Sequence, residues 1–214
     1  MGRIYLIRHG QTDSNAGRSF QGRIDNPLNE LGLDQARQMA EYVKTLEIDA
    51  IYSSSMLRAR QTAEVLAEKC GLVNQPMDLL QEISFGQWEG RSFARLWEES
   101  PKEMGIFMTT PADYTPPEGE SLAQAQARCE KALAQILEKE GHDKNIAIVS
   151  HGGIIRLQLC SLLNCPLNSL WRFSVHNVSV STISDWDGNL IADTLNDYHF
   201  LEGAINPKST PSIV

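Results

Sequence analysis

The first ten residues constrain this chain most. Residues 3–7 (Arg-Ile-Tyr-Leu-Ile) are rich in β-branched, aromatic and aliphatic side chains, which predicts a short buried strand. Arg8, His9 and Gly10 follow directly, where the backbone must leave the sheet. Ligands bind at the carboxyl ends of strands in open α/β sheets, and arginine with histidine there suits an anion. On these ten residues alone, a solvated Arg8 and a packed loop residue at His9 explain the pattern equally well.

Two later segments repeat this arrangement of a strand with a polar side chain at its carboxyl end. Residues 144–150 predict the clearest buried strand of the chain, which leads into His151 and an apolar helix. Residues 49–53 predict another strand, and Arg58 lies in the first turn of the helix expected over 56–70. In a parallel sheet these strand ends lie on one edge, so two histidines and two arginines can converge there.

The alternation of strands and helices predicts an α/β fold. We expect a three-layer α/β/α sandwich with a mostly parallel central sheet and helices on both faces. A length of 214 residues fits a single domain over 1–214. Asn29 is the expected N-cap of one helix, the serines at 53–55 are expected caps of the next, and Ser121 opens a third. A hairpin is expected around Asp187 and its following glycine.

The segment 91–120 is the least regular part of the sequence. Within it only residues 93–99 predict a helical turn or two, and the rest predicts a loop rich in large apolar side chains. Long loops of this kind often cover binding sites. We therefore expect a cap or lid at about 91–120, with a surface helix docked on the core as the alternative.

The charge balance limits the partners of the protein. A formal net charge of −8 repels nucleic acid and anionic membranes, so an anion site must be a local concentration of arginine. The sequence has no apolar run of about 18 residues and no signal-peptide pattern, so we expect a cytoplasmic protein without a nucleic-acid or membrane partner. The four cysteines form no CxxC pair, which disfavours a metal site or disulfide framework. A homodimer is left open.

Two histidines and a carboxylate are also the donor set of zinc and non-haem iron sites, and His9, His151 and Glu82 would supply it. Two arginines in the same pocket would repel a divalent cation. Their guanidinium groups are fixed forks of donors that suit phosphate oxygens. We therefore expect no metal and a small phosphorylated metabolite as the ligand.

Five blocks of the sequence resemble the histidine phosphatase superfamily, also called the phosphoglycerate mutase-like family. They occur in the family's order and cover roughly residues 1–163. A lone Arg-His-Gly is a weak signal, whereas five ordered blocks are a specific one. In chain order the blocks are residues 8–12 with Asn15, 21–22 and 25–28, residues 53–63, Glu82 with Gly86 and 88–90, residues 119–121 and residues 150–153.

The resemblance implies a reaction through a phosphohistidine, without a metal or other cofactor. His9 would be the nucleophile that attacks phosphorus. Glu82 would protonate the leaving alkoxide and then activate a water. The groups that would hold the transferring phosphoryl oxygens and offset their charge are Arg8, Arg58 and His151. Further residues expected to bind the phosphate or the ester are Asn15, Gln21, Gly22, Thr12 and Gly152.

The fate of the phosphohistidine leaves three functions open. Mutases of the family carry extra basic residues between the glutamate and the Gly-Glu-Ser block, where this chain has mainly large apolar side chains. The pattern is more similar to the small phosphatases, so a metal-independent phosphomonoesterase, with α-ribazole 5'-phosphate as one substrate to consider, is the first hypothesis. A 2,3-bisphosphoglycerate-dependent phosphoglycerate mutase is the second. A non-catalytic phosphate-binding module is the third, although such a module needs neither Glu82 nor His9.

Overall fold

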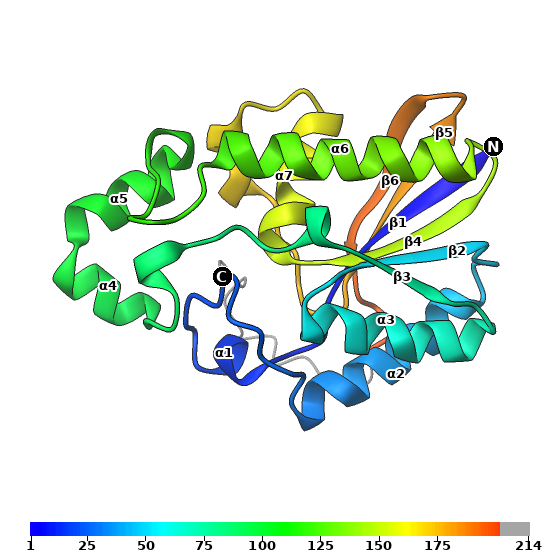
Figure 1. Ribbon diagram of the computed structural model, residues 1–214, viewed down its shortest axis with the longest axis horizontal. Coiled ribbons are helices and arrows are strands. Elements are labelled where there is room, and N and C mark those ends of the chain that lie inside the picture. Colours follow the sequence, from blue (N-terminus) through cyan, green and yellow to red (C-terminus); the bar gives the residue numbers. More distant parts are fainter. Residues whose placement is uncertain (202–214) are drawn as a thin grey trace.

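A computed structural model of the chain describes residues 1–201 and contains a six-stranded sheet in the order β3-β2-β4-β1-β5-β6 (Figure 1). Strands β1 to β4 are parallel to one another, and β5 and β6 are antiparallel additions beyond β1. The expected mostly parallel sheet and the terminal hairpin are therefore confirmed. The strands are β1 (Gly2–Arg8), β2 (Ala50–Ser54), β3 (Asn74–Met77), β4 (Asn145–Ser150), β5 (Val180–Trp186) and β6 (Asn189–Asp197).

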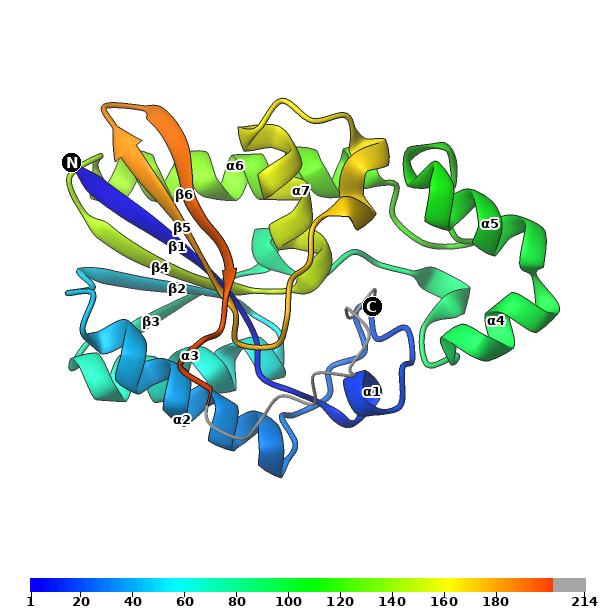
Figure 2. The same ribbon diagram turned by 180° about the vertical axis from the view of Figure 1, so that it is seen from behind.

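Helices cover both faces of this sheet, which confirms the three-layer arrangement (Figures 1 and 2). Along β1 the side chains alternate, so that Tyr5 and Ile7 pack with one pair of helices, and Ile4 and Leu6 pack with the other pair. Both faces of the parallel strands are thereby buried, as expected for such a sheet. The first pair is α2 (Glu30–Lys44) and α3 (Leu57–Cys70), and the second is α6 (Leu122–Glu140) and α7 (Gly152–Leu162).

The helix starts predicted at Asn29 and Ser121 are confirmed. The serine cap predicted for α3 is wrong. Met56 is the N-cap residue and makes no side-chain cap bond, while the Leu57 N–H donates to the carboxylate of Asp25 at 2.6 Å. A carboxylate from a distant loop thus satisfies a first-turn N–H that the local serines were expected to satisfy.

The segment expected as a cap contains two helices, α4 (Phe93–Glu99) and α5 (Pro101–Thr109). The prediction of a loop after residue 99 is wrong. A proline at the first helical position of α5 lacks only an N–H that would be unpaired there anyway. Met104 and Phe107, three residues apart, bury one face of α5 in a separate apolar cluster that includes Phe20. Figures 1 and 2 show both helices beyond the carboxyl ends of the parallel strands.

The short elements include one strand that the sequence did not predict. Residues 74–77 of β3 read Asn-Gln-Pro-Met, which is not an apolar strand pattern. The strand lies at the edge of the sheet, where a proline is accepted. No helix within residues 1–201 is long and apolar enough to span a bilayer. The remaining helical elements are α1 (Asp13–Ala16) and the 3-10 turns η1 (Asp78–Leu80), η2 (Gly86–Trp88), η3 (Pro111–Asp113) and η4 (Leu167–Arg172).

Candidate active site

A pocket lies where the carboxyl ends of β1, β2 and β4 meet. The parallel register of β1 and β4 sets Arg8 opposite Ser150, the residue before His151. The rings of His9 and His151 come within 5.2 Å of each other, centroid to centroid. Most of the predicted site residues thus converge from distant parts of the chain. The pocket is lined by Arg8, His9, Asn15, Gln21, Gly22, Arg58, Glu82, Phe85, Gly153, Arg156 and Trp171.

The His9 ring is held in one tautomer. Its Nδ1 lies 2.7 Å from the Gly10 carbonyl oxygen, which can only accept, so Nδ1 carries the proton. Nε2 therefore keeps its lone pair and accepts a hydrogen bond from Arg58 Nε at 3.2 Å. A glycine is required beside it, because a Cβ on Gly10 would lie 2.4 Å from the Gly32 carbonyl oxygen. The close approach of α2 thus fixes the position of Gly10, whose carbonyl oxygen accepts the hydrogen bond from the His9 ring.

The electrostatics keep both histidines neutral. Burial, followed by the charges of Arg58 and Arg8, holds the pKa of His9 well below its usual value. Burial and the charge of Arg58 do the same to the pKa of His151. A neutral imidazole is the form that can act as a nucleophile, because only it has a free lone pair. The site therefore presents an unprotonated Nε2 beside two cations.

Backbone carbonyls orient the two arginines. Arg58, which is 1% exposed, donates to the carbonyl oxygens of Ile24 at 2.9 Å and Gly22 at 2.8 Å as well as to the His9 ring. Arg8 donates to the Val175 carbonyl oxygen at 2.7 Å. Burial lowers the pKa of both side chains to about 10, so both remain cationic at neutral pH. Positive charge is thus fixed in position before any anion binds.

His151 sits at the N-cap position of α7. Its Nε2 forms a hydrogen bond of 2.8 Å with the Ser54 hydroxyl at the end of β2. Its Nδ1 is buried and has no hydrogen-bond partner among the described residues. A buried ring nitrogen without a partner is costly, and a ligand oxygen would relieve that cost. The N-terminal end of α7 adds a favourable dipole for an anion.

Glu82 is held by two backbone N–H groups. Its Oε2 accepts from Gly153 at 3.1 Å and its Oε1 from Ile83 at 2.9 Å. A Cβ on Gly153 would lie 2.5 Å from Oε1, so a side chain there would displace the carboxylate. Within residues 1–201 the structure contains no group of three or more His, Cys, Asp or Glu side chains that could hold a metal ion. Glu82 lines the pocket together with Arg8 and Arg58.

Three of the predicted phosphate-binding residues, His151, Thr12 and Gly152, are not among the residues that line the pocket. Thr12 is buried, and its hydroxyl donates to Gln21 Oε1 at 3.0 Å, which orients a residue that does line it. A Cβ on Gly152 would come within 2.9 Å of the Arg156 guanidinium and 3.5 Å of Arg8. The absence of a side chain at Gly152 therefore makes room for these arginines.

Four lining residues, Phe85, Gly153, Arg156 and Trp171, were not predicted as site residues from the sequence. Arg156 lies on α7, is 2% exposed, and donates to the Phe173 carbonyl oxygen at 2.8 Å with its guanidinium carbon 5.5 Å from the Trp171 ring. Its signal was a single arginine in an otherwise apolar helix segment, one turn after Gly152. Phe85 lies between Glu82 and Gly86 of the third block, and its apolar side chain gave no reason to assign it to the site. Trp171 lies in a short 3-10 turn, where no periodic pattern marks it.

Comparisons with known proteins identify the family of the chain. A sequence model of the histidine phosphatase superfamily (branch 1) matches residues 4–198. The chain belongs to this superfamily, which confirms the resemblance drawn from the five blocks, and it is a histidine phosphatase superfamily enzyme.

Curated relatives of the chain include phosphatases and mutases. It is 33% identical over 183 residues to the putative phosphoserine phosphatase 2 of Hydrogenobacter thermophilus, covering 86% of this chain and 89% of that protein. It is 34% identical over 180 residues to the probable phosphoglycerate mutase GpmB of Yersinia pestis, covering 84% and 83%. Relatives at this level of identity show the family of the chain.

Solved structures show the same fold. A mycobacterial glucosyl-3-phosphoglycerate phosphatase in complex with VO3 superposes with a TM-score of 0.85 at 31% identity, covering 92% of this chain and 99% of that one. A phosphoserine phosphatase mutant from Entamoeba histolytica in complex with phosphoserine gives a TM-score of 0.83 at 28% identity, covering 94% and 100%. The α/β architecture described above is therefore that of known histidine phosphatases.

Proposed function

We propose that this enzyme is a metal-independent phosphomonoesterase that hydrolyses small phosphorylated metabolites through a phosphohistidine at His9. The observation that carries the proposal is the state of the His9 ring. Its Nδ1 proton is committed to the Gly10 carbonyl oxygen, and its Nε2 lone pair lies beside the Arg58 guanidinium. A lone pair placed against a fixed cation is what attack on an anionic phosphoryl group requires.

In the first half-reaction the Nε2 lone pair forms the N–P bond while the bond from phosphorus to the ester oxygen breaks. Arg8, Arg58 and His151 hold the phosphoryl oxygens and offset the charge that spreads over them in the transition state. In support of this role, the Nδ1 of His151 is buried and has no hydrogen-bond partner within residues 1–201, so we propose that it donates to one of these oxygens. Glu82, protonated at this stage, gives its proton to the departing ester oxygen, so an alcohol leaves.

In the second half-reaction a water attacks the phosphohistidine. Glu82, now a carboxylate, takes a proton from this water, and the N–P bond breaks to release inorganic phosphate. The His9 ring regains its lone pair, and Glu82 regains its proton. The positive charge needed in both steps comes from arginines, so we include no metal in the mechanism.

The residues that line the pocket also indicate which kind of leaving group the substrate carries. Phe85 and Trp171 line it beside the phosphate-binding groups, and aromatic rings suit an organic moiety better than a second phosphate. We propose that α4 and α5 act as a cap over this side. A mutase is the second candidate function, because Arg156 adds a third guanidinium to the same wall and could hold a second anionic group.

A metabolite screen in the presence of a chelator tests this proposal. Release of inorganic phosphate from p-nitrophenyl phosphate and from phosphoserine, 3-phosphoglycerate or α-ribazole 5'-phosphate, unaffected by chelation, is the expected result. A mutase would instead interconvert 2- and 3-phosphoglycerate in a reaction that depends on 2,3-bisphosphoglycerate. Loss of phosphate release on chelation, with recovery on adding back a metal, would overturn the metal-independent mechanism.

A further inference from the structure

The proposed mechanism uses four of the five sequence blocks and leaves the Gly-Glu-Ser block at 119–121 without a role. We propose that Arg128 and Glu120 form a positioning pair that sets the place of the Glu82 carboxylate in the pocket. Neither residue lines the pocket. Both act through the segment that carries Glu82, and the inference rests on the proposed role of Glu82 as the proton donor.

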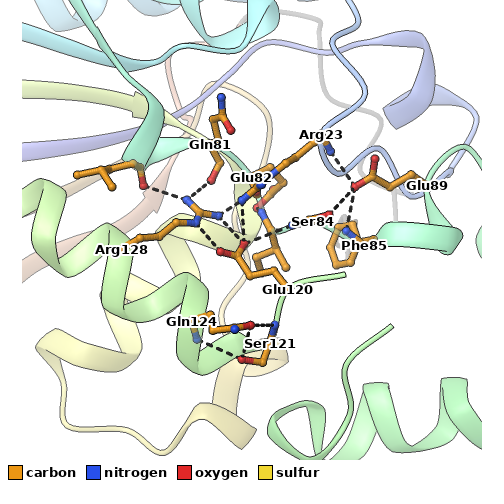
Figure 3. Close-up of polar contacts among 12 residues, drawn as sticks. Arg23, Gln81, Glu82, Ser84, Phe85, Glu89, Glu120, Ser121, Gln124 and Arg128 are labelled. Carbon is orange, nitrogen blue, oxygen red and sulfur yellow. Dashed lines mark hydrogen bonds and ion pairs between the residues drawn. The ribbon is translucent and has the colours of Figure 1, made fainter. Parts of the chain in front are cut away.

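Arg128 donates to three carbonyl oxygens, one in η1 and two in the segment that carries Glu82. One terminal nitrogen lies 2.9 Å from the Leu79 oxygen and 2.5 Å from the Gln81 oxygen, and the other lies 3.0 Å from the Glu82 oxygen. Figure 3 shows the guanidinium surrounded by these carbonyls. The segment between η1 and η2 belongs to no helix or strand, so no ladder of backbone bonds holds it. The guanidinium supplies the missing donors.

Glu120 completes the pair from the opposite side of the guanidinium. Its two carboxylate oxygens accept from Arg128 at 2.7 and 2.8 Å, and the two side chains are only 14% and 13% exposed. The backbone N–H of Glu120 donates to the Ser84 carbonyl oxygen at 2.8 Å, two residues beyond Glu82. A two-point, nearly buried ion pair of this kind fixes orientation as well as charge. The segment is thus held on both sides of Glu82.

The result is that Glu82 is held at both ends. Its backbone carbonyl is fixed by Arg128, while its carboxylate accepts the N–H groups of Ile83 and Gly153. Arg23, which follows the predicted phosphate-binding residue Gly22, donates to Glu120 at 3.4 Å (Figure 3). The pair therefore links the segment of the proton donor to the loop on the phosphate side. An acid displaced by about 1 Å can lose about 100-fold in rate, so this link matters for catalysis.

The several N–H donors of the guanidinium group make position 128 specific to arginine. A lysine at position 128 could keep the charge beside Glu120 but has a single nitrogen, which cannot meet three carbonyls and two carboxylate oxygens together. We therefore expect Arg128→Lys to recover only part of what Arg128→Met loses. Glu120→Gln keeps the size of the side chain and removes its charge, so it should resemble Arg128→Met.

The test compares two aryl esters, phenyl phosphate and p-nitrophenyl phosphate, which differ by one nitro group on the ring. Phenolate is a basic leaving group that needs the proton of Glu82, whereas p-nitrophenolate leaves without it. We expect Arg128→Met and Glu120→Gln to lower kcat/KM about 10- to 100-fold for phenyl phosphate and little for p-nitrophenyl phosphate. Lys144→Met, which breaks an exposed ion pair with Asp49 at the amino end of β4, is the control and should change neither value.

A double variant separates positioning from a general structural role. If Arg128 acts through Glu82, adding Arg128→Met to Glu82→Gln costs no further activity on phenyl phosphate. Equal losses on both esters, or a full further loss in the double variant, would overturn the inference. If Glu82→Gln itself fails to discriminate between the esters, the proposed role of Glu82 falls instead, so the two failures are distinguishable.

Discussion

The Nε–H of Arg58 donates to Nε2 of His9 at 3.2 Å, so the cation that would bind the phosphate also rests against the nitrogen that would attack it. Arg58 reaches this place from the first turn of α3, a position where acidic residues are usually favoured. One side chain thereby orients the proposed nucleophile, adds to the effect of burial in lowering the pKa of that ring, and places positive charge at the proposed reaction centre.

Replacing Arg58 should therefore damage catalysis more than folding. We expect Arg58→Met to lower kcat/KM for p-nitrophenyl phosphate by about 100- to 1,000-fold, the usual effect of removing one preorganised donor of transition-state charge. Steady-state kinetics and a thermal unfolding curve measure the two effects. Arg60→Met, in the same helix turn but exposed and paired with Glu64, is the control and should keep near-normal activity.

The buried neutral histidines should make stability depend on pH in the acid range. His9 and His151 have folded-state pKa values below the unfolded value of about 6.5, so below that pH the unfolded chain binds protons that the folded chain does not. Stability should fall as the pH falls through that value, by up to about 1.4 kcal/mol per pH unit for each histidine, until the folded-state pKa values are reached.

Urea unfolding between about pH 5 and 7 measures this dependence. The wild-type curve minus that of a His9→Gln, His151→Gln double variant isolates the part due to these two rings from that of the carboxylates. Identical pH slopes for the two proteins would show that the buried histidines are not held neutral.

The glycines offer a steric test of the proton donor. In Gly153→Ala the new Cβ would lie 2.5 Å from Glu82 Oε1, so the carboxylate must move and phenyl phosphate hydrolysis should fall about 10- to 100-fold. Gly105, in the middle of α5, has no atom within 4 Å of an added Cβ. Gly105→Ala should keep full activity and gain about 1 kcal/mol of stability, because alanine is the better helix former. Activity retained in Gly153→Ala would argue against Glu82 as the acid.

The convergence of the site was predictable because it follows from topology. His9 and His151 come after neighbouring parallel strands, so the sheet itself brings them together once both strands are recognised. Arg58 could be added in the same way, as it follows β2, which pairs with β4. Local caps at Asn29 and Ser121 were also visible, since the residues concerned are close in sequence.

What escaped prediction depends on contacts that no short sequence window contains. Arg128 meets carbonyls 46 to 49 residues away, and Asp25 caps a helix that begins 32 residues later. The helix α5 was missed because its large apolar side chains were assigned to a loop over the pocket, whereas Met104 and Phe107 pack in their own cluster. Arg156 was missed because the sequence of an apolar helix does not show that one of its arginines lines a pocket; that requires the position of the neighbouring elements.

The phosphohistidine is the central claim, and rapid acid-free quenching of the enzyme with a ³²P-labelled substrate tests it most directly. We expect a phosphate bond that is acid-labile and base-stable, mapped to the peptide of His9, and absent from His9→Ala, which should have no measurable turnover. His199→Ala, with an exposed ring, should label normally. Full activity in His9→Ala, or turnover of the wild type with no labelled enzyme at any time, would contradict the mechanism.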